Sequence, residues 1–164
     1  MAEGGIETQF VTFGLDDDRF AAPVAQVREI LDYRPAAKIP NGPPYLLGMI
    51  DVRGQGVPAL DLRVRLGLGP IQPTPHTRIL VLDVMLEDRI LTLGVVADRV
   101  FEVITIASDE IKPAPDVGVA WQSDYIAGVV RRSDGFIVLM DIGQLLSSSD
   151  EAALPSVSGI GVAA

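Results

Sequence analysis

A stretch of about 20 residues occurs twice in this chain, and this internal repeat constrains the fold more than any other feature. Three residues of the first copy recur 80 positions later: Tyr45 as Tyr125, Gly48 as Gly128, and Asp61 as Asp141. No gap is needed between these anchors, and a fixed-offset match of this length is rare by chance. The chain is therefore predicted to consist of two related halves.

The first copy of the repeat has the pattern of a β-hairpin followed by a short helix. Two apolar runs, 46–50 and 57–62, flank a polar turn, which is typical of two strands joined by a tight connection. Asp61 stands where an N-cap is needed before a helix at 62–66. Gly67 follows, where a left-handed conformation suits glycine.

The other segments give each half the same order: hairpin, helical turn, proline-rich loop, hairpin, short helix. The expected strands are 9–15, 19–22, 78–86, 90–96, 125–132 and 136–140, and the expected helical segments are 24–30, 97–103 and 142–146. Pro58 lies inside an expected strand, which predicts that this strand is at a sheet edge or bulged. Residues 69–77 contain three prolines and are the best candidate linker.

Short strands in halves of about 60–70 residues must close on themselves to protect the sheet edges. We therefore predict a mainly β protein of two small barrels side by side, at 8–70 and 77–147. The pattern leaves open whether a strand or the last helix is exchanged between the halves. Residues 148–164 are rich in Ser, Ala and Gly and are expected to form a disordered tail.

Composition limits the classes of partner. Of 164 residues, 48% are hydrophobic, which supports a well-filled core. The formal net charge of −9 repels phosphate groups, so nucleic acid and anionic membranes are poor candidate partners. No apolar run reaches the roughly 18 residues of a membrane span, and no signal peptide is recognisable. With no cysteine, disulfides and thiolate metal sites are excluded, and a cytoplasmic location is expected.

Candidate catalytic groups are few. His76 is the only histidine, and in the expected linker it lacks the second group that a general base or a metal ligand requires. Asp61 and Asp141 are equivalent positions of the repeat, and helix capping explains them better than a catalytic carboxylate pair. The three aspartates at 16–18 lack the spacing of a calcium loop. We therefore expect no enzyme activity, no catalytic residue, no metal and no cofactor.

Five segments resemble, in order, motifs of the CheW family, the coupling proteins of bacterial chemosensory arrays. The segments are F-V-T-F-G-L (10–15), V-x-Q-V-R-E-I (24–30), G-M-I-D-V-R-G-x-x-V-P-A-L-D-L-R (48–63), G-V-V-A-D-R-V-x-E-V (94–103) and Y-I-A-G-V-V (125–130). The resemblance covers residues 8–147, and the hairpin motif ending R-G-x-x-V-P-x-x-D-L-R is specific to the family. It implies two pseudo-equivalent five-stranded, SH3-like β-barrels without catalytic activity.

The resemblance also implies the partners: the cytoplasmic tip of a chemoreceptor and the regulatory domain of a chemotaxis histidine kinase. The protein would be recruited to membrane-associated receptor arrays without inserting into the membrane. The receptor tip would lie in a groove between the barrels. The positions that match the family's receptor groove are Val27, Glu29, Arg53, Ile79, Gly94 and Val100.

A physical interpretation of these positions leaves alternatives open. Val27 and Val100 are equivalent in the two halves, so both suit a seam between the barrels, and barrel core is an equal alternative. Gly94 either lets another backbone approach or marks a β-bulge. Arg53, at a hairpin tip, can bind a carboxylate or a cluster of helix C-terminal carbonyls, and the alternative is an ordinary arginine of a turn. Glu29 equally suits a solvated surface charge.

Two residues depart from the family pattern. Asp51 stands where the family usually has Asn. Its charge is expected either to weaken the contact of Arg53 with an acidic partner or to hold Arg53 in a local ion pair. Gly56 replaces a bulkier strand residue, which predicts a bulge.

Three rival functions stay open. The first is a CheW-like adaptor of a chemosensory pathway that controls pili, development or gene expression. The second is an oligonucleotide-binding barrel, which the acidic charge and the lack of an aromatic stacking platform oppose. The third is a small hydrolase that uses Asp61 or Asp141, which requires that carboxylate to lie in an open cleft.

Overall fold

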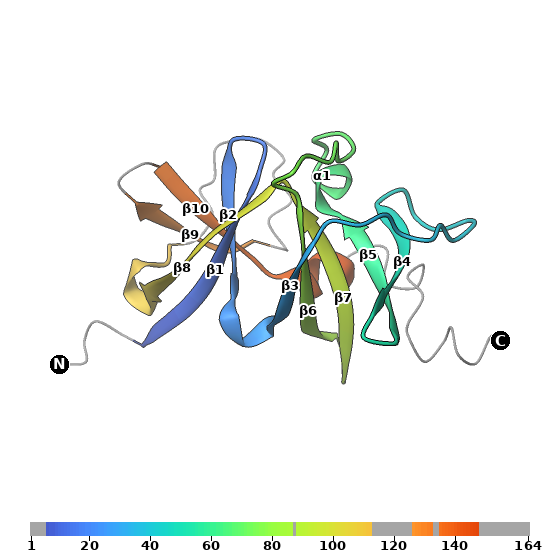
Figure 1. Cartoon of the computed structure of the whole chain (residues 1–164). Coiled ribbons are helices and arrows are strands. Elements are labelled where there is room, and N and C mark those ends of the chain that lie inside the picture. The colour runs from blue at the N-terminus through green and yellow to red at the C-terminus, as the bar shows by residue number, and fades with distance from the viewer. Residues whose placement is uncertain (1–5, 87, 113–125, 133–134, 148–164) are drawn as a thin grey trace.

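The computed structural model describes residues 6–86, 88–112, 126–132 and 135–147, and all structural statements below concern these residues. They form ten strands, two short α-helices and two 3-10 turns (Figure 1). The strands are β1 (Glu7–Leu15), β2 (Asp18–Pro23), β3 (Val27–Asp32), β4 (Leu46–Val52), β5 (Gln55–Asp61), β6 (Arg78–Leu86), β7 (Arg89–Ala97), β8 (Arg99–Ala107), β9 (Ile126–Arg132) and β10 (Gly135–Met140). The helices are α1 (Leu62–Arg65) and α2 (Ile142–Ser147), and the 3-10 turns are η2 (Val24–Gln26) and η3 (Ser108–Glu110).

The strands build two five-stranded sheets, and the predicted fold class is confirmed. The first sheet has the order β8-β1-β2-β10-β9 and is called barrel A; the second has the order β3-β6-β7-β5-β4 and is called barrel B. Figure 1 shows the two barrels side by side, with β1 and β2 of barrel A to the left of β6 and β7 of barrel B. No helix within the described ranges is long and apolar enough to cross a membrane.

Each sheet combines a hairpin from one half of the sequence with three strands from the other half. The β1–β2 hairpin joins β8, β9 and β10, whereas the β6–β7 hairpin joins β3, β4 and β5. Strands from both 8–70 and 77–147 therefore occur in both sheets. The division into folding units at 8–70 and 77–147 stays a prediction, because the order of strands in the sheets does not test it.

The chain closes each barrel at equivalent places. Beyond β3, Ala37 pairs with Met49 through two backbone hydrogen bonds of 2.8 Å. Beyond β8, Lys112 pairs with Val129 through hydrogen bonds of 2.9 and 2.8 Å. Because Met49 and Val129 are 80 positions apart, the internal repeat marks the point where each barrel closes.

The repeated glycine is explained by this closure. A Cβ atom on Gly48 would lie 2.0 Å from the carbonyl oxygen of Ala37. A Cβ atom on Gly128 would lie 2.4 Å from Cγ2 of Ile111. A Cβ atom at position 48 would therefore collide with the backbone of the closing segment, and one at position 128 would collide with its Ile111 side chain. Glycine suits both positions because it lets the closing segment approach closely.

Three apolar clusters form the core. One fills barrel A and includes Ile106 and Val130, and another fills barrel B and includes Ile79 and Val81. The largest, here called the central cluster, takes buried side chains from both barrels, among them Phe13 of β1 and Leu82 and Leu93 of β6 and β7. Strands β6 and β7 are buried on both faces because one face points into barrel B and the other into the central cluster, which explains their nearly continuous apolar runs.

Two expected helices are wrong. Residues 24–30 form the brief η2 turn and then β3, and residues 97–103 form the end of β7 and most of β8. The apolar spacing V-x-x-V-x-x-I fits a helix face, but the segments pair antiparallel with β6 and β1, respectively. Pairing with a distant strand outweighs this local pattern, as it often does for β-branched residues.

The expectations for β5 are also wrong. This strand lies between β7 and β4, so it is not at an edge, and Pro58 pairs with Met49 in regular register. The parallel ladder to β7 begins only at Ala59, so the missing N–H of Pro58 lies outside the pairing with that strand. Gly56 pairs regularly with Asp51 and forms no bulge; the register shift of this hairpin lies between Leu46 and Gly48.

The predicted helix caps are confirmed. Asp61 accepts a hydrogen bond of 3.0 Å from the N–H of Arg63, and Asp141 accepts one of 3.1 Å from Gln144. Gly67 has φ +80°, in the left-handed region. Other expectations concern Tyr125, the turn at 133–134 and the tail at 148–164, which lie outside the described residues.

Candidate functional site

The six residues that the sequence suggests for receptor binding occupy three different environments. Glu29 and Arg53 form an ion pair on the surface of barrel B. Val27 and Val100 pack against the central cluster. Ile79 and Gly94 lie inside barrel B.

The Glu29–Arg53 pair is bidentate. Nε of Arg53 donates to Oε2 of Glu29 at 3.1 Å, and Nη2 donates to Oε1 at 3.2 Å. The hydrogen bond to Glu29, with the charge of its carboxylate, raises the pKa of Arg53 above the ordinary value. The Arg53 side chain is 81% exposed, whereas that of Glu29 is 18% exposed. The pair therefore holds a guanidinium at the surface in a fixed direction, with N–H donors still available.

The turn between β4 and β5 sets the position of Arg53. Arg53 and Gly54 have φ values of +54° and +86°, and two central residues with positive φ suit a tight hairpin. Oδ1 of Asp51 accepts a hydrogen bond of 2.8 Å from the N–H of Gly54. Of the two roles expected for Asp51, an ion pair with Arg53 is wrong, because the guanidinium binds Glu29 instead. An Asn side chain also has an Oδ1 acceptor, so Asp and Asn can support the turn in the same way.

Val27 and Val100 lie at equivalent places in the two barrels. Val27 opens β3 and pairs with Leu82, and Val100 lies near the start of β8 and pairs with Phe13. Both valines are partly buried and pack against the central cluster. Their side chains thus contribute to the seam between the barrels and retain some accessible surface.

Ile79 and Gly94 contact the interior of barrel B. The side chain of Ile79 is completely buried. A Cβ atom on Gly94 would lie 3.0 Å from Cγ2 of Ile79 and 3.5 Å from Cδ1 of Ile50. The register at Gly94 is regular, so the alternative of a β-bulge is wrong. Ile79 and Gly94 are therefore suited to shape the barrel beneath a binding surface.

Arg63 forms a polar cluster that the sequence interpretation missed. Its Nη1 group donates to the carboxylates of Asp16 and Asp98, the latter at 2.8 Å. Its Nε and Nη2 groups donate to the backbone oxygens of Gly69 and Leu68 at 3.2 and 2.9 Å. The hydrogen bond to Asp16 is the main cause that raises the pKa of Arg63. The side chain is 13% exposed and ties α1 to the β1–β2 turn of barrel A and to the β7–β8 connection.

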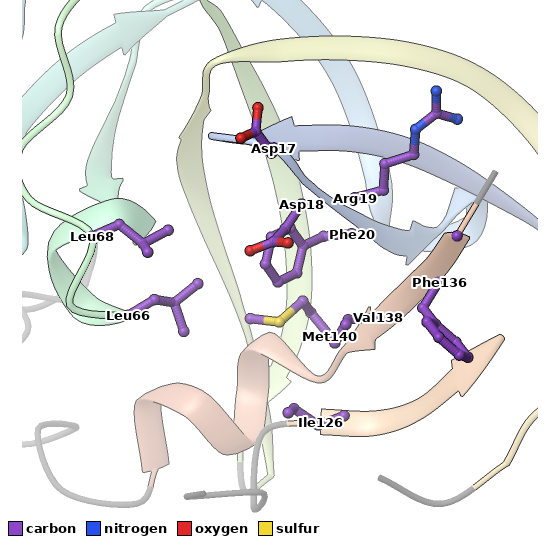
Figure 2. A pocket seen from close by; sticks show the side chains of 11 residues that line it. Asp17, Asp18, Arg19, Phe20, Leu66, Leu68, Ile126, Phe136, Val138 and Met140 are labelled. Carbon is purple, nitrogen blue, oxygen red and sulfur yellow. The ribbon is translucent and has the colours of Figure 1, made fainter. Parts of the chain in front are cut away.

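A groove of about 550 Å³ between barrel A and the end of α1 was also missed. Figure 2 shows Leu66 and Leu68 on one side, Phe136 and Val138 on the other, and Met140 between them. The sequence signal was Phe136, an aromatic residue directly after the Asp-Gly turn, where a polar residue would suit an exposed strand end. Because Phe136 is 61% exposed, it lies at the rim of what we call the β2–β10 groove.

The carboxylates considered for hydrolysis have structural partners. Asp61 is buried, and its second oxygen accepts a hydrogen bond of 2.8 Å from the N–H of Ile71. Asp61 therefore does not meet the requirement for an open cleft. His76 is exposed in the connection between the halves, where its backbone N–H binds Thr74. Among the described residues, no group of three His, Asp or Glu side chains is placed to hold a metal ion.

Comparison with known proteins gives consistent matches over nearly the whole chain. The family described as CheW-like domain matches residues 9–150. The probable chemotaxis protein CheW of Rhizobium etli is 29% identical over 147 residues, which are 90% of this chain and 92% of that protein. Protein FrzA of Myxococcus xanthus is 30% identical over 155 residues, which are 93% of this chain and 94% of that protein.

A solved structure has the same fold. The crystal structure of the scaffolding protein TtCheW from Thermoanaerobacter tengcongensis superposes with a TM-score of 0.76 at 25% sequence identity. The superposition covers 87% of this chain and 94% of that one. The two-barrel arrangement is therefore shared with a scaffolding protein.

Proposed function

Because this chain belongs to the CheW-like domain family, we propose that it couples the cytoplasmic tip of a chemoreceptor to the regulatory domain of a chemotaxis histidine kinase. The family is one of scaffolds, and the chain is a chemotaxis coupling adaptor. We further propose that it works in the cytoplasm and is recruited to membrane-associated receptor arrays.

The main support for a receptor-binding site is the bidentate ion pair between Glu29 and Arg53. An exposed guanidinium that is already oriented by a carboxylate loses little side-chain entropy when a partner binds. Its remaining donors suit a carboxylate or the C-terminal carbonyls of a receptor helix. Val27 and Val100 would supply apolar contacts at the nearby seam, and Ile79 with Gly94 would support the barrel wall beneath.

The direct test is binding of the purified chain to each partner separately. We expect capture of a receptor-tip helical hairpin and of a kinase regulatory domain, and of both together in a ternary complex. Binding to neither partner would refute the proposal. Binding to the kinase domain alone would refute the receptor site.

A second candidate function is an adaptor of a chemosensory pathway that controls pili, development or gene expression. The observation that favours it is the match to FrzA, which extends over as much of the chain as the matches to chemotaxis proteins do. Deletion of the gene would separate the two: loss of directed swimming supports the first candidate, and normal swimming with altered pili or development supports the second.

A further inference from the structure

The β2–β10 groove has an apolar floor that continues into the core. Phe20 and Met140 are buried members of the central cluster, and Leu66, Leu68 and Val138 are partly buried and pack against it. The volume of about 550 Å³ is within the range of pockets that enclose a few side chains or a small ligand. None of the six proposed receptor residues lines this groove, so it is a separate surface.

The charges at the two ends of the groove differ in sign. Asp17, in the β1–β2 turn, and Asp18, the first residue of β2, line one end, and both residues are exposed. At the other end, the guanidinium of Arg131 lies 5.9 Å from the ring centre of Phe136. Arg19 also lines the groove, but its guanidinium stacks on Phe101, 4.4 Å from the ring centre, and Figure 2 shows it pointing away from Met140. The groove therefore favours an occupant whose cationic group points toward Asp17 and Asp18.

The repeat shows that this end of the groove is specific to barrel A. Phe136 and Arg131 face each other across β9 and β10, and 80 positions earlier the paired residues are Gly56 and Asp51. Barrel B thus has no aromatic side chain and no cation at the equivalent place. An exposed Phe beside an Arg is unusual on an ordinary surface strand and typical of contact surfaces, where both residue types are enriched.

We propose that the β2–β10 groove binds a short segment of a partner protein that carries a bulky aliphatic side chain next to a lysine or arginine. The aliphatic group packs between Leu66 and Val138 over Met140. The cation lies against Asp17 and Asp18. Apolar contact with the groove supplies most of the affinity, and the two carboxylates fix the direction of the segment.

The test selects peptides without assuming a partner. A library of random dodecapeptides displayed on phage is selected against the full chain, and enriched peptides are synthesised and titrated by fluorescence polarisation. We expect enriched sequences with Lys or Arg close to Leu, Ile or Met. Phe136→Ser, and separately Asp17→Asn with Asp18→Asn, should each weaken binding by about tenfold or more.

Control substitutions come from the β6–β7 hairpin of barrel B, which corresponds to the β1–β2 hairpin of barrel A. Ile90 is 65% exposed and Asp88 is exposed, so Ile90→Ser and Asp88→Asn should change binding less than about twofold. All the substituted side chains are exposed, and circular dichroism checks that each variant folds.

Three outcomes would overturn the proposal. The first is that no enriched peptide depends on Phe136. The second is that enriched peptides lack a basic residue and are indifferent to the aspartate substitutions. The third is that peptides bind only after residues 148–164 are removed, since the chain's own end would then occupy the groove. The result is independent of the receptor pull-down, because the two sites share no proposed residue.

Discussion

Two arginines in this chain show how exposure determines what an ion pair does. Arg53 and Arg63 each bind carboxylates through the guanidinium, but their side chains are 81% and 13% exposed. An exposed pair contributes little to stability because solvent screens it. A largely buried cation is costly to leave without its partners. Arg53 is therefore suited to recognition, and Arg63 to holding the fold.

Replacing Arg53 by glutamate should weaken receptor binding by about tenfold or more, because it reverses the charge that faces the partner. The thermal midpoint should change by no more than about 2 °C. Isothermal titration with a receptor-tip hairpin and scanning calorimetry measure the two effects. Arg89→Glu, at the exposed end of β7, is the matched control and should leave binding intact. A large loss of stability in Arg53→Glu would show that the arginine is structural.

Replacing Arg63 by alanine should lower the free energy of unfolding by about 2–4 kcal/mol, because Asp16, Asp98 and two backbone oxygens lose their donor. Urea denaturation measures this loss. Arg28→Ala is the control: Arg28 pairs with Asp83 at 3.1 Å but its side chain is 46% exposed, so we expect less than about 1 kcal/mol. If the two variants lost the same free energy of unfolding, Arg63 would not have the structural role proposed for it.

The stability that Arg63 gives to the folded state should not change near neutral pH through titration of its own guanidinium. The folded state raises the pKa of Arg63, so its stabilising effect is fully present below the unfolded pKa. That effect is lost only as the pH rises through the raised folded pKa, in strongly alkaline solution.

At the scale of the element, turn and cap chemistry could be predicted from the sequence, but strand pairing could not. The β4–β5 hairpin and the Asp61 cap depend on residues within a few positions of one another, so local rules identified them. Strand β3 pairs with β6, about 50 residues away, and its apolar spacing alone fits a helix equally well. For the same reason Arg63 was missed, because Asp16 and Asp98 are 47 and 35 residues away from it.

The barrel closures give a prediction at this scale. Gly48→Ala should destabilise the chain by about 2–4 kcal/mol, because its Cβ atom would meet the carbonyl oxygen of Ala37 and its φ is +139°. Gly128→Ala should cost less in barrel A, because its Cβ atom would meet the side chain of Ile111 at 2.4 Å and the carbonyl oxygen of Lys112 only at 3.1 Å. Gly56→Ala is the control, since its Cβ atom would contact only the flexible end of Met49, at 3.2 Å. Urea denaturation compares the free energies of unfolding of the three variants. If Gly48→Ala left this free energy unchanged, the close approach of Ala37 to Gly48 would not be needed for stability.

At the scale of the whole molecule, the central cluster joins the two barrels into one unit. It takes buried residues from β1 and β2 of barrel A and from β6 and β7 of barrel B. Each barrel also contains a hairpin from the other half of the sequence. A pattern with a fixed offset reveals two related halves, but it cannot show which sheet each hairpin joins, because the repeat would be the same in either arrangement.

Shared packing predicts cooperative unfolding. Leu82 is 1% exposed in the central cluster, so Leu82→Ala should cost about 2–5 kcal/mol. Because Leu82 packs in a cluster that both barrels share, amides of β1 and of β6 should lose the same free energy of hydrogen exchange, although the substitution is in barrel B. Ile90→Ala, at a side chain that is 65% exposed, should leave both unchanged. If β1 kept its full protection in Leu82→Ala, the barrels would be independent units and the seam between them could not hold a rigid binding groove.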